Sequence, residues 1–212
     1  MISAFQDFPC VQAGFCNAEE SPSLQNPILM NQVHSADVIV LNQTPDTPPS
    51  CDALATHTPN LKLTVKTADC APVLFLDPVA KVVAATHAGW KGAFQGILGN
   101  TILTLLQMGA TISNLHVAVG PHLTQENFQV SSDMQALFPK TEHHFFESRK
   151  TGLYFDFSGY ILHRLKRAGV QHIDLHAIDT FTDLTYNSYR RNKQDPARQY
   201  SFIQITEGAE HV

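Results

Sequence analysis

The sequence contains no uninterrupted apolar run of the roughly 18 residues that a membrane-spanning helix requires. Its opening stretch, MISAFQDFPC, also lacks the basic residues followed by an apolar segment that are typical of a signal peptide. We therefore expect a cytoplasmic protein with no membrane partner.

Positive charge is scarce in this chain. Lysine and arginine together number 14 against 19 aspartate and glutamate residues, which gives a formal net charge of −5. The basic residues are scattered except in the stretch SYRRNK, residues 188–193. Proteins that bind nucleic acids generally present a clustered basic surface, so the sequence argues against a nucleic-acid partner.

Closely paired cysteines are also absent. The four cysteines are Cys10, Cys16, Cys51 and Cys70, and no two of them form a CxxC pair. This spacing excludes a zinc ribbon, which is built from such pairs. In a cytosolic chain of this size, cysteines are more often free, metal-bound or catalytic than joined in disulfides.

The length and composition predict one domain. The chain has 212 residues, of which 43% are hydrophobic, and this is enough for one substantial core. No Gly/Ser-rich linker separates two halves, and the Pro-rich residues 42–52 are typical of a surface loop. We therefore expect a single domain over residues 1–212.

Strand-like segments outnumber helix-like segments. The predicted helices cover about residues 92–108, 132–137 and 157–168. Because strands and helices do not alternate regularly, we predict an α+β fold and not a doubly wound parallel sheet. The predicted strands, all rich in β-branched residues, are 27–33, 38–41, 61–66, 72–76, 81–87, 115–120, 172–178 and 200–205.

Two of these strands bring a cysteine close to a histidine. Asp77-Pro78 lies between the strand-like segments 72–76 and 81–87 and is typical of a short turn. Counting outward from this turn pairs residues 73–76 with residues 82–85. The pairing places Cys70 and His87 at the same end of a hairpin.

A third candidate ligand, His34, follows the strand-like segment 27–33. Two imidazoles and one thiolate form a three-ligand set for zinc, which leaves a fourth position open for water or substrate. Each residue also has a simpler explanation. A buried cysteine often serves as a small apolar residue, and an isolated histidine is often a core or surface residue with satisfied hydrogen bonds.

The stretch AATHAGWKGAFQG, residues 84–96, has the composition of an anion site. His87 ends a strand, and Gly89 and Gly92 permit a tight backbone with close approach of a ligand. Lys91 adds positive charge beside a helix N-terminus, where backbone N–H groups are unpaired. The alternative is a turn with an incidental histidine.

Six stretches occur in order over about residues 30–205: NQVHSADVIVL, CDALATHTPNLKLTVKTADCAPVLFLD, VVAATHAGWKGAFQGIL, VAVGPHLTQENFQV, FDFSGYILHRLKRAGV and YNSYRRN. They resemble the bacterial laccase-domain proteins, described as polyphenol oxidases, as purine nucleoside phosphorylase/adenosine deaminases and as peptidoglycan editing factor. TADCAPVLFLD followed by THAGWKG is the most specific pair. The resemblance implies zinc bound by His34, Cys70 and His87, and mixed β-sheets in an αββα layered sandwich.

The chain departs from this family pattern at three places. The N-terminal segment AGFCNAEESPSLQNPI is short, and Cys16-Asn17 stands where the family has Thr-Arg, so an arginine expected to help bind substrate is missing. Asp179-Thr180 replaces a Cys-Thr pair, and Gln129 replaces a glutamate. These changes bear on substrate choice and leave the three predicted zinc ligands in place.

The resemblance favours a zinc-dependent enzyme whose substrates are a small-molecule purine nucleoside and phosphate. The reactions would be phosphorolysis of adenosine, inosine or methylthioadenosine and deamination of adenosine, with zinc lowering the pKa of bound water. Cys70, His87 and Asp52 are the candidate catalytic residues. Asp52 would orient a ligand histidine or act as acid or base, and its simpler explanation is a turn-forming aspartate. A homodimer is compatible with this function.

Phosphorolysis also requires groups that hold phosphate. Lys91, Arg190 and Arg191 are the candidates, although the two arginines would also suit a solvated surface. Trp90, the only tryptophan, would stack on the base or anchor the turn by packing.

Three alternatives remain open. With Cys70 as nucleophile and His87 as its base, the chain would be a hydrolase, such as an amidase acting on a peptidoglycan precursor. A non-catalytic protein that binds a metal or a partner is the second alternative. A copper oxidase is the weakest, because the sequence offers one histidine/cysteine cluster and multi-copper electron transfer needs several.

Overall fold

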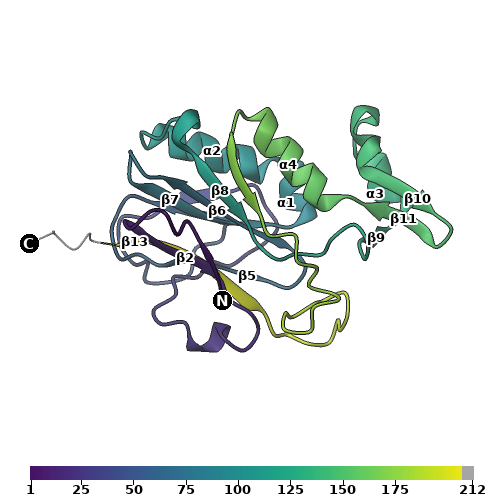
Figure 1. Ribbon diagram of the computed structural model, residues 1–212, viewed down its shortest axis with the longest axis horizontal. Helices are drawn as coiled ribbons and strands as arrows, with labels where there is room; N and C mark the ends of the chain where they lie inside the picture. Colours follow the sequence, from purple (N-terminus) through teal and green to yellow (C-terminus); the bar gives the residue numbers. More distant parts are fainter. Residues whose placement is uncertain (207–212) are drawn as a thin grey trace, which may run out of the picture.

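The computed structural model describes residues 1–206, in which three β-sheets combine with four α-helices and three short 3-10 helices (Figure 1). None of these helices has the length and apolarity that a membrane span needs. The strands are β1 Ile2–Ala4, β2 Val11–Phe15, β3 Val38–Val40, β4 Ala53–Thr56, β5 Leu63–Thr67, β6 Ala71–Asp77, β7 Val82–Ala88, β8 His116–Val119, β9 Gln129–Val130, β10 Phe146–Arg149, β11 Gly152–Phe155, β12 His172–Leu175 and β13 Gln199–Ile205. The helices are α1 Trp90–Gln95, α2 Ile97–Gln107, α3 Ser132–Leu137, α4 Phe157–Arg167, η1 Ser21–Ser23, η2 Ile112–Asn114 and η3 Lys140–Phe145.

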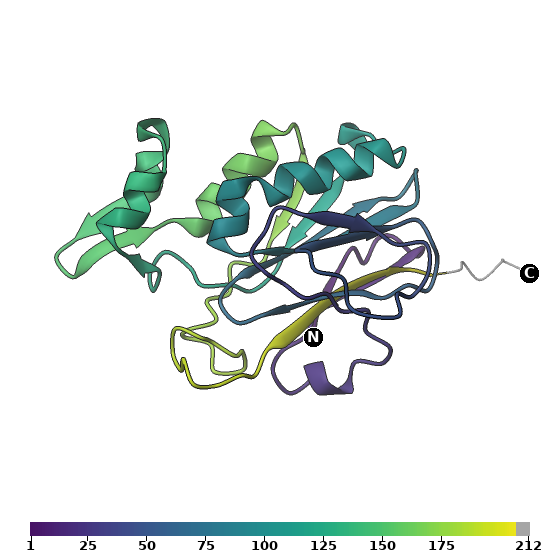
Figure 2. The ribbon, with the colours of Figure 1, turned by 180° about the vertical axis from the view of Figure 1, so that it is seen from behind.

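The fold is layered. A six-stranded sheet of order β12-β8-β6-β7-β4-β3 lies in the middle, with α1, α2 and α4 over one face (Figures 1 and 2). The four-stranded antiparallel sheet β1-β2-β13-β5 packs on its other face. The third sheet, β10-β11-β9, extends to one side together with α3 (Figure 2). The arrangement confirms the predicted α+β fold of mixed sheets.

The central strands are largely apolar because both faces of the six-stranded sheet are covered. Alternate side chains of a strand point to opposite faces. Val73 and Phe75 of β6 accordingly pack with the helices, whereas Leu74 and Leu76 pack against the four-stranded sheet. Every residue of β6 and β7 is buried. The adjoining site is therefore built on a rigid support.

The long helix predicted over residues 92–108 is in fact two helices. Gly96 separates α1 from α2 with φ of 102°, a left-handed conformation that glycine adopts without steric cost. The prediction was wrong because apolar spacing continues across the break. Helix α3 is confirmed over 132–137, and α4 ends one residue before the predicted boundary at 168.

The predicted hairpin of β6 and β7 is confirmed, but its register is shifted by one residue. Val73 pairs with Thr86, because the connection is a longer loop in which the Asp77 carboxylate accepts the N–H groups of Val79 and Ala80, each at 2.9 Å. Pro72 consequently lies opposite His87. Cys70 and His87 still meet at one end of the hairpin.

The strand predicted over residues 27–33 is wrong. This segment forms only isolated bridges, from Ile28 to Leu63 and from Asn31 to Ser50. The backbone amides of residues 33–35 are bound by the side chain of Asp52 and not by a neighbouring strand. The sequence analysis also missed β4, whose short run of residues 53–56 carries little β-branched character.

Candidate metal centre and its cavity

Three separate segments bring His34, Cys70 and His87 together. His34 lies on the irregular segment after residues 27–33, Cys70 directly precedes β6, and His87 is in β7. One ligand atom from each residue lies within 4.8 Å of the others, and the two imidazole centroids are 4.8 Å apart. Within residues 1–206 this is the one such cluster of three histidine, cysteine or acidic side chains.

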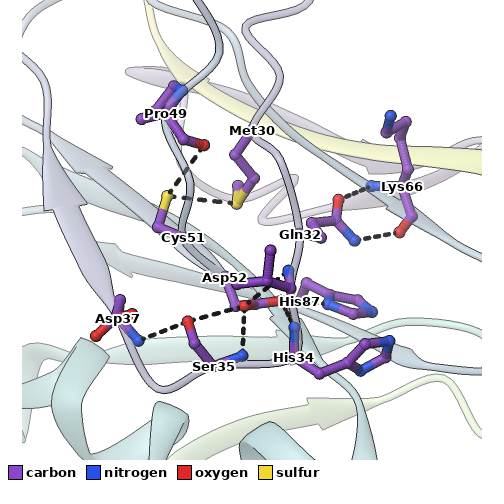
Figure 3. Close-up of polar contacts among 11 residues, drawn as sticks. Met30, Gln32, His34, Ser35, Asp37, Pro49, Cys51, Asp52, Lys66 and His87 are labelled. Atoms are coloured by element: carbon purple, nitrogen blue, oxygen red, sulfur yellow. Dashed lines mark hydrogen bonds and ion pairs between the residues drawn. The ribbon is translucent and has the colours of Figure 1, made fainter.

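The buried carboxylate of Asp52 orients His87 (Figure 3). Its Oδ1 lies 2.7 Å from Nδ1 of His87. A carboxylate accepts, so Nδ1 carries the proton and the lone pair of Nε2 is left for a ligand. In many metalloproteins a carboxylate accepts the N–H of a metal-binding histidine in this way and so orients the ring.

The same carboxylate holds the segment that carries His34. It accepts the backbone N–H groups of Val33, His34 and Ser35 at 3.2, 3.1 and 2.6 Å, and the Ser35 hydroxyl at 2.9 Å. His34 has φ of 60°, an uncommon conformation for a residue with a side chain. Asp52 therefore fixes both histidines of the cluster from one point.

With no metal bound, the groups around His87 favour its protonated form. Burial alone would lower the pKa of His87, but Cys70 and the Asp52 carboxylate outweigh it and raise that pKa to about 9. Burial opposes ionisation of Asp52, yet hydrogen bonds from His87 and Ser35 lower its pKa to about 2. Burial and the neighbouring His87 lower the pKa of His34, which favours the neutral form of that imidazole.

Gly89 makes the close approach of these groups possible. A Cβ at this position would overlap Nδ1 of His34 and lie 3.3 Å from Sγ of Cys70. Any larger residue would displace the two side chains. The glycine between β7 and α1 is thus required by the cluster itself.

The donor set fits a transition metal. Two imidazoles and one thiolate suit zinc, and histidine and cysteine also bind copper. The buried Asp52 satisfies Nδ1 of His87, so the other ring nitrogen is available.

The cluster opens onto a cavity of about 1160 Å³. This volume exceeds the range of about 300–1,000 Å³ that is typical of ligand pockets. All three candidate ligands line it, and so does Trp90. The aromatic side chains Phe128, Phe157 and Tyr189 contribute apolar surface.

The predicted phosphate contacts have different surroundings. Arg190 lines the cavity and donates from its guanidinium to the carbonyl of Asn127 at 2.9 Å. Lys91 is exposed, does not line the cavity, and lies 5.7 Å from the ring centroid of Trp90. Arg191 does not line the cavity either, and its guanidinium donates to the carbonyls of Thr180, Phe181 and Tyr186.

Sequence reasoning missed Asp69. Its backbone has φ of 84°, directly before Cys70. Its carboxylate accepts the hydroxyl of Thr180 at 2.8 Å and the N–H of Arg190 at 2.6 Å. An aspartate adjacent to a candidate ligand was the available signal. Its partners are more than a hundred residues away along the chain, so the sequence did not reveal them.

The sequence is similar to those of known proteins. A family model described as "Multi-copper polyphenol oxidoreductase laccase" matches residues 10–206. The chain is 33% identical over 183 residues to a purine nucleoside phosphorylase of Rickettsia conorii, covering 82% of this chain and 75% of that one. It is 34% identical over 175 residues to a purine nucleoside phosphorylase of Deinococcus radiodurans, covering 82% and 68%.

Solved structures share the fold. A protein of Neisseria meningitidis superposes with a TM-score of 0.80 at 29% identity, over 89% of this chain and 78% of that one. The hypothetical protein YfiH of Bacillus licheniformis has a TM-score of 0.82 at 22% identity, over 92% and 93%. The resemblance drawn from the motifs is confirmed, and the chain belongs to the family described as multi-copper polyphenol oxidoreductase laccase.

Proposed function

We propose that this chain is a zinc-dependent purine nucleoside phosphorylase. Its substrates are adenosine, inosine or methylthioadenosine together with phosphate, and deamination of adenosine is a second reaction at the same site. The observation that carries the proposal is the cluster of His34, Cys70 and His87 at the wall of a large cavity. The names of the relatives from Rickettsia and Deinococcus supply the substrate class.

The three ligands would hold zinc, which when bound acts as a Lewis acid and lowers the pKa of a water molecule. Zinc is preferred to a multi-copper centre because multi-copper electron transfer needs several clusters and residues 1–206 contain one. Asp52 is proposed as a positioning residue. Its oxygens are occupied by His87 and by the amides of residues 33–35, and it does not line the cavity.

The cavity wall is suited to a purine. Trp90, Phe128 and Phe157 line it and present flat apolar surface against which a base can pack. Asp69 fixes the backbone at Cys70 and ties it to Arg190. Binding and orientation of the nucleoside would thus depend on the aromatic side chains, with Asp69 holding two of the cavity walls together.

The test is a product assay by chromatography on zinc-loaded protein. Adenosine is supplied with and without phosphate. Adenine formed only with phosphate indicates phosphorolysis, and inosine indicates deamination. Cys70→Ala should abolish both products. Cys10→Ala should retain them, because Cys10 does not line the cavity. Absence of both products from folded, zinc-loaded parent protein would refute the proposal.

A second candidate is a metal-free cysteine hydrolase acting on an amide, with a peptidoglycan precursor as the substrate class. The observation that favours it is the pairing of Cys70 with a His87 whose pKa is raised to about 9. An imidazolium beside a thiolate is the resting state of Cys–His nucleophiles. A chelator should abolish the phosphorylase and leave the hydrolase active, because zinc bound to the thiolate suppresses its nucleophilicity.

A further inference from the structure

The lining of the cavity is strongly basic. Lys66 of β5 and three residues of the segment leading into β13, Arg190, Lys193 and Arg198, all line the cavity. We call these four residues the cationic wall. Within residues 1–206, Asp69 is the one carboxylate among the lining side chains. The cavity is therefore positive in a chain whose formal net charge is −5.

The carboxylate of Asp69 does not neutralise the cationic wall through side-chain contacts. One oxygen accepts the Thr180 hydroxyl and the other accepts the backbone N–H of Arg190. Its bonds are thus to a hydroxyl and a peptide group. Both of its oxygens are already engaged.

Within residues 1–206, no carboxylate forms an ion pair with a side chain of the cationic wall. The guanidinium groups of Arg190 and Arg198 donate to backbone carbonyls, at 2.9 Å to Asn127 and 3.1 Å to Asp195. Carbonyl acceptors satisfy donors but carry no net charge. Four like charges on one wall repel one another, and an anion in the cavity would offset that repulsion.

The backbone that carries the wall is held in place. The side-chain amide of Gln32 donates to the carbonyl of Lys66 at 2.7 Å and accepts its N–H at 2.8 Å. Figure 3 shows the Lys66 side chain directed away from His34 and His87. The segment that carries Arg190, Lys193 and Arg198 is held by the hydrogen bond from the Arg190 N–H to the Asp69 carboxylate. A prepositioned wall loses less conformational entropy on binding a ligand.

We propose that the cationic wall is the subsite for a phosphate group, with Lys66 and Lys193 as its principal ammonium contacts. Arginine and lysine are the side chains that bind phosphate most effectively, through charge-assisted hydrogen bonds. The phosphate is either free orthophosphate or a phosphoryl group carried by the nucleoside. The assignment of that phosphate as a substrate group rests on the proposed function, whereas its binding needs no turnover.

The test compares binding of orthophosphate, adenosine and AMP by calorimetry at constant ionic strength. The variants are the double substitution Lys66→Met/Lys193→Met and the control Lys150→Met, which lies in the turn between β10 and β11. The parent, the double variant and the control all keep His34, Cys70 and His87. Any phosphate bound at that cluster therefore contributes equally in the three proteins. Methionine preserves the aliphatic stem, and circular dichroism verifies the fold.

Loss of about tenfold or more in orthophosphate affinity in the double variant, with adenosine binding and the control unchanged, supports free phosphate as the ligand. Unchanged orthophosphate affinity with loss of the preference for AMP over adenosine supports a phosphorylated nucleoside. The proposal is overturned if the double variant binds both anions like the parent, or if the parent binds neither below about 10 mM. Phosphate binding without turnover would refute the phosphorylase and leave the subsite standing.

Discussion

Nδ1 of His87 donates a hydrogen bond to the buried carboxylate of Asp52 at 2.7 Å. The same carboxylate accepts the N–H of Ser35 at 2.6 Å, next to His34. One side chain thus positions two candidate metal ligands that lie 53 residues apart in sequence. Their relative placement depends on the charge and the acceptor capacity of Asp52.

The substitution Asp52→Asn tests this dependence. The amide retains the shape but removes the negative charge and one of the two acceptor oxygens, so we expect zinc affinity to fall by about 10–100-fold. Competition with a chromogenic chelator measures the affinity. Asp37→Asn is the matched control. Asp37 lies in the same segment, and within residues 1–206 its hydrogen bonds are made by its backbone. Equal affinities for the parent and Asp52→Asn would contradict the role.

Substitution of Gly89 tests the effect of crowding at the cluster without removing any of the three candidate ligands. In Gly89→Ala the new Cβ overlaps the ring of His34, and relief of this overlap costs about 1–3 kcal/mol of unfolding free energy or moves the ring. We expect zinc affinity to fall by about tenfold or more. Spectra of the cobalt-substituted protein report the change at the cluster.

Gly99→Ala is the control for this change. Gly99 lies in α2, and no neighbouring atom is within 4 Å of a Cβ built there. Alanine in an exposed helix position should raise stability by about 0.5–1 kcal/mol and leave metal binding unchanged. If Gly89→Ala behaves like Gly99→Ala, the close approach at Gly89 has no bearing on the cluster.

The sequence predicted the cluster of His34, Cys70 and His87 better than it predicted the backbone segments around it. Cys70 and His87 could be brought together from a single hairpin, because their pairing depends on a local turn and survives a register error of one residue. His34 could not be placed this way. Its position depends on three amides bound by Asp52, and side-chain-to-backbone bonds of this kind leave no periodic pattern in a sequence.

The sequence could not predict which of the two arginines lines the cavity, for a related reason. Arg190 and Arg191 are neighbours in the chain, yet only Arg190 lines the cavity. The difference arises where the N–H of Arg190 binds Asp69, 121 residues earlier. Contacts between irregular segments follow from tertiary packing, which the sequence pattern does not reveal. The sequence analysis therefore predicted both arginines as phosphate contacts.

The bond between Asp69 and Arg190 predicts a graded response at Asp69. Asp69→Ala loses two hydrogen bonds and places alanine at φ of 84°, so we expect a loss of about 2–4 kcal/mol in unfolding free energy. Asp69→Asn should lose less, because asparagine tolerates the left-handed conformation and keeps one acceptor oxygen. Urea denaturation measures both, and hydrogen exchange at the Arg190 amide should accelerate most in Asp69→Ala. Equal losses of unfolding free energy in the two variants would contradict a stabilising role for the Asp69 side chain and its left-handed backbone.

His122 predicts a stability that depends on pH. The side chain is fully buried, with Nδ1 2.8 Å from the carbonyl of Gly120 and Nε2 2.7 Å from the hydroxyl of Ser158. The carbonyl requires a donor, so Nδ1 carries the proton and Nε2 accepts from Ser158. Burial lowers the pKa of His122, although Gly120 and nearby carboxylates oppose the shift.

Because the folded pKa lies below the unfolded value of about 6.5, the unfolded chain binds the proton first as pH falls. The contribution of His122 is therefore unchanged above that pH and is lost below it. The loss grows as the pH falls from 7.5 to 5.5. Urea denaturation at the two pH values should show a smaller decrease for His122→Gln than for the parent. The control His57→Asn alters an exposed histidine and should retain the parental decrease. An equal decrease in all three proteins would assign the acid sensitivity to other groups.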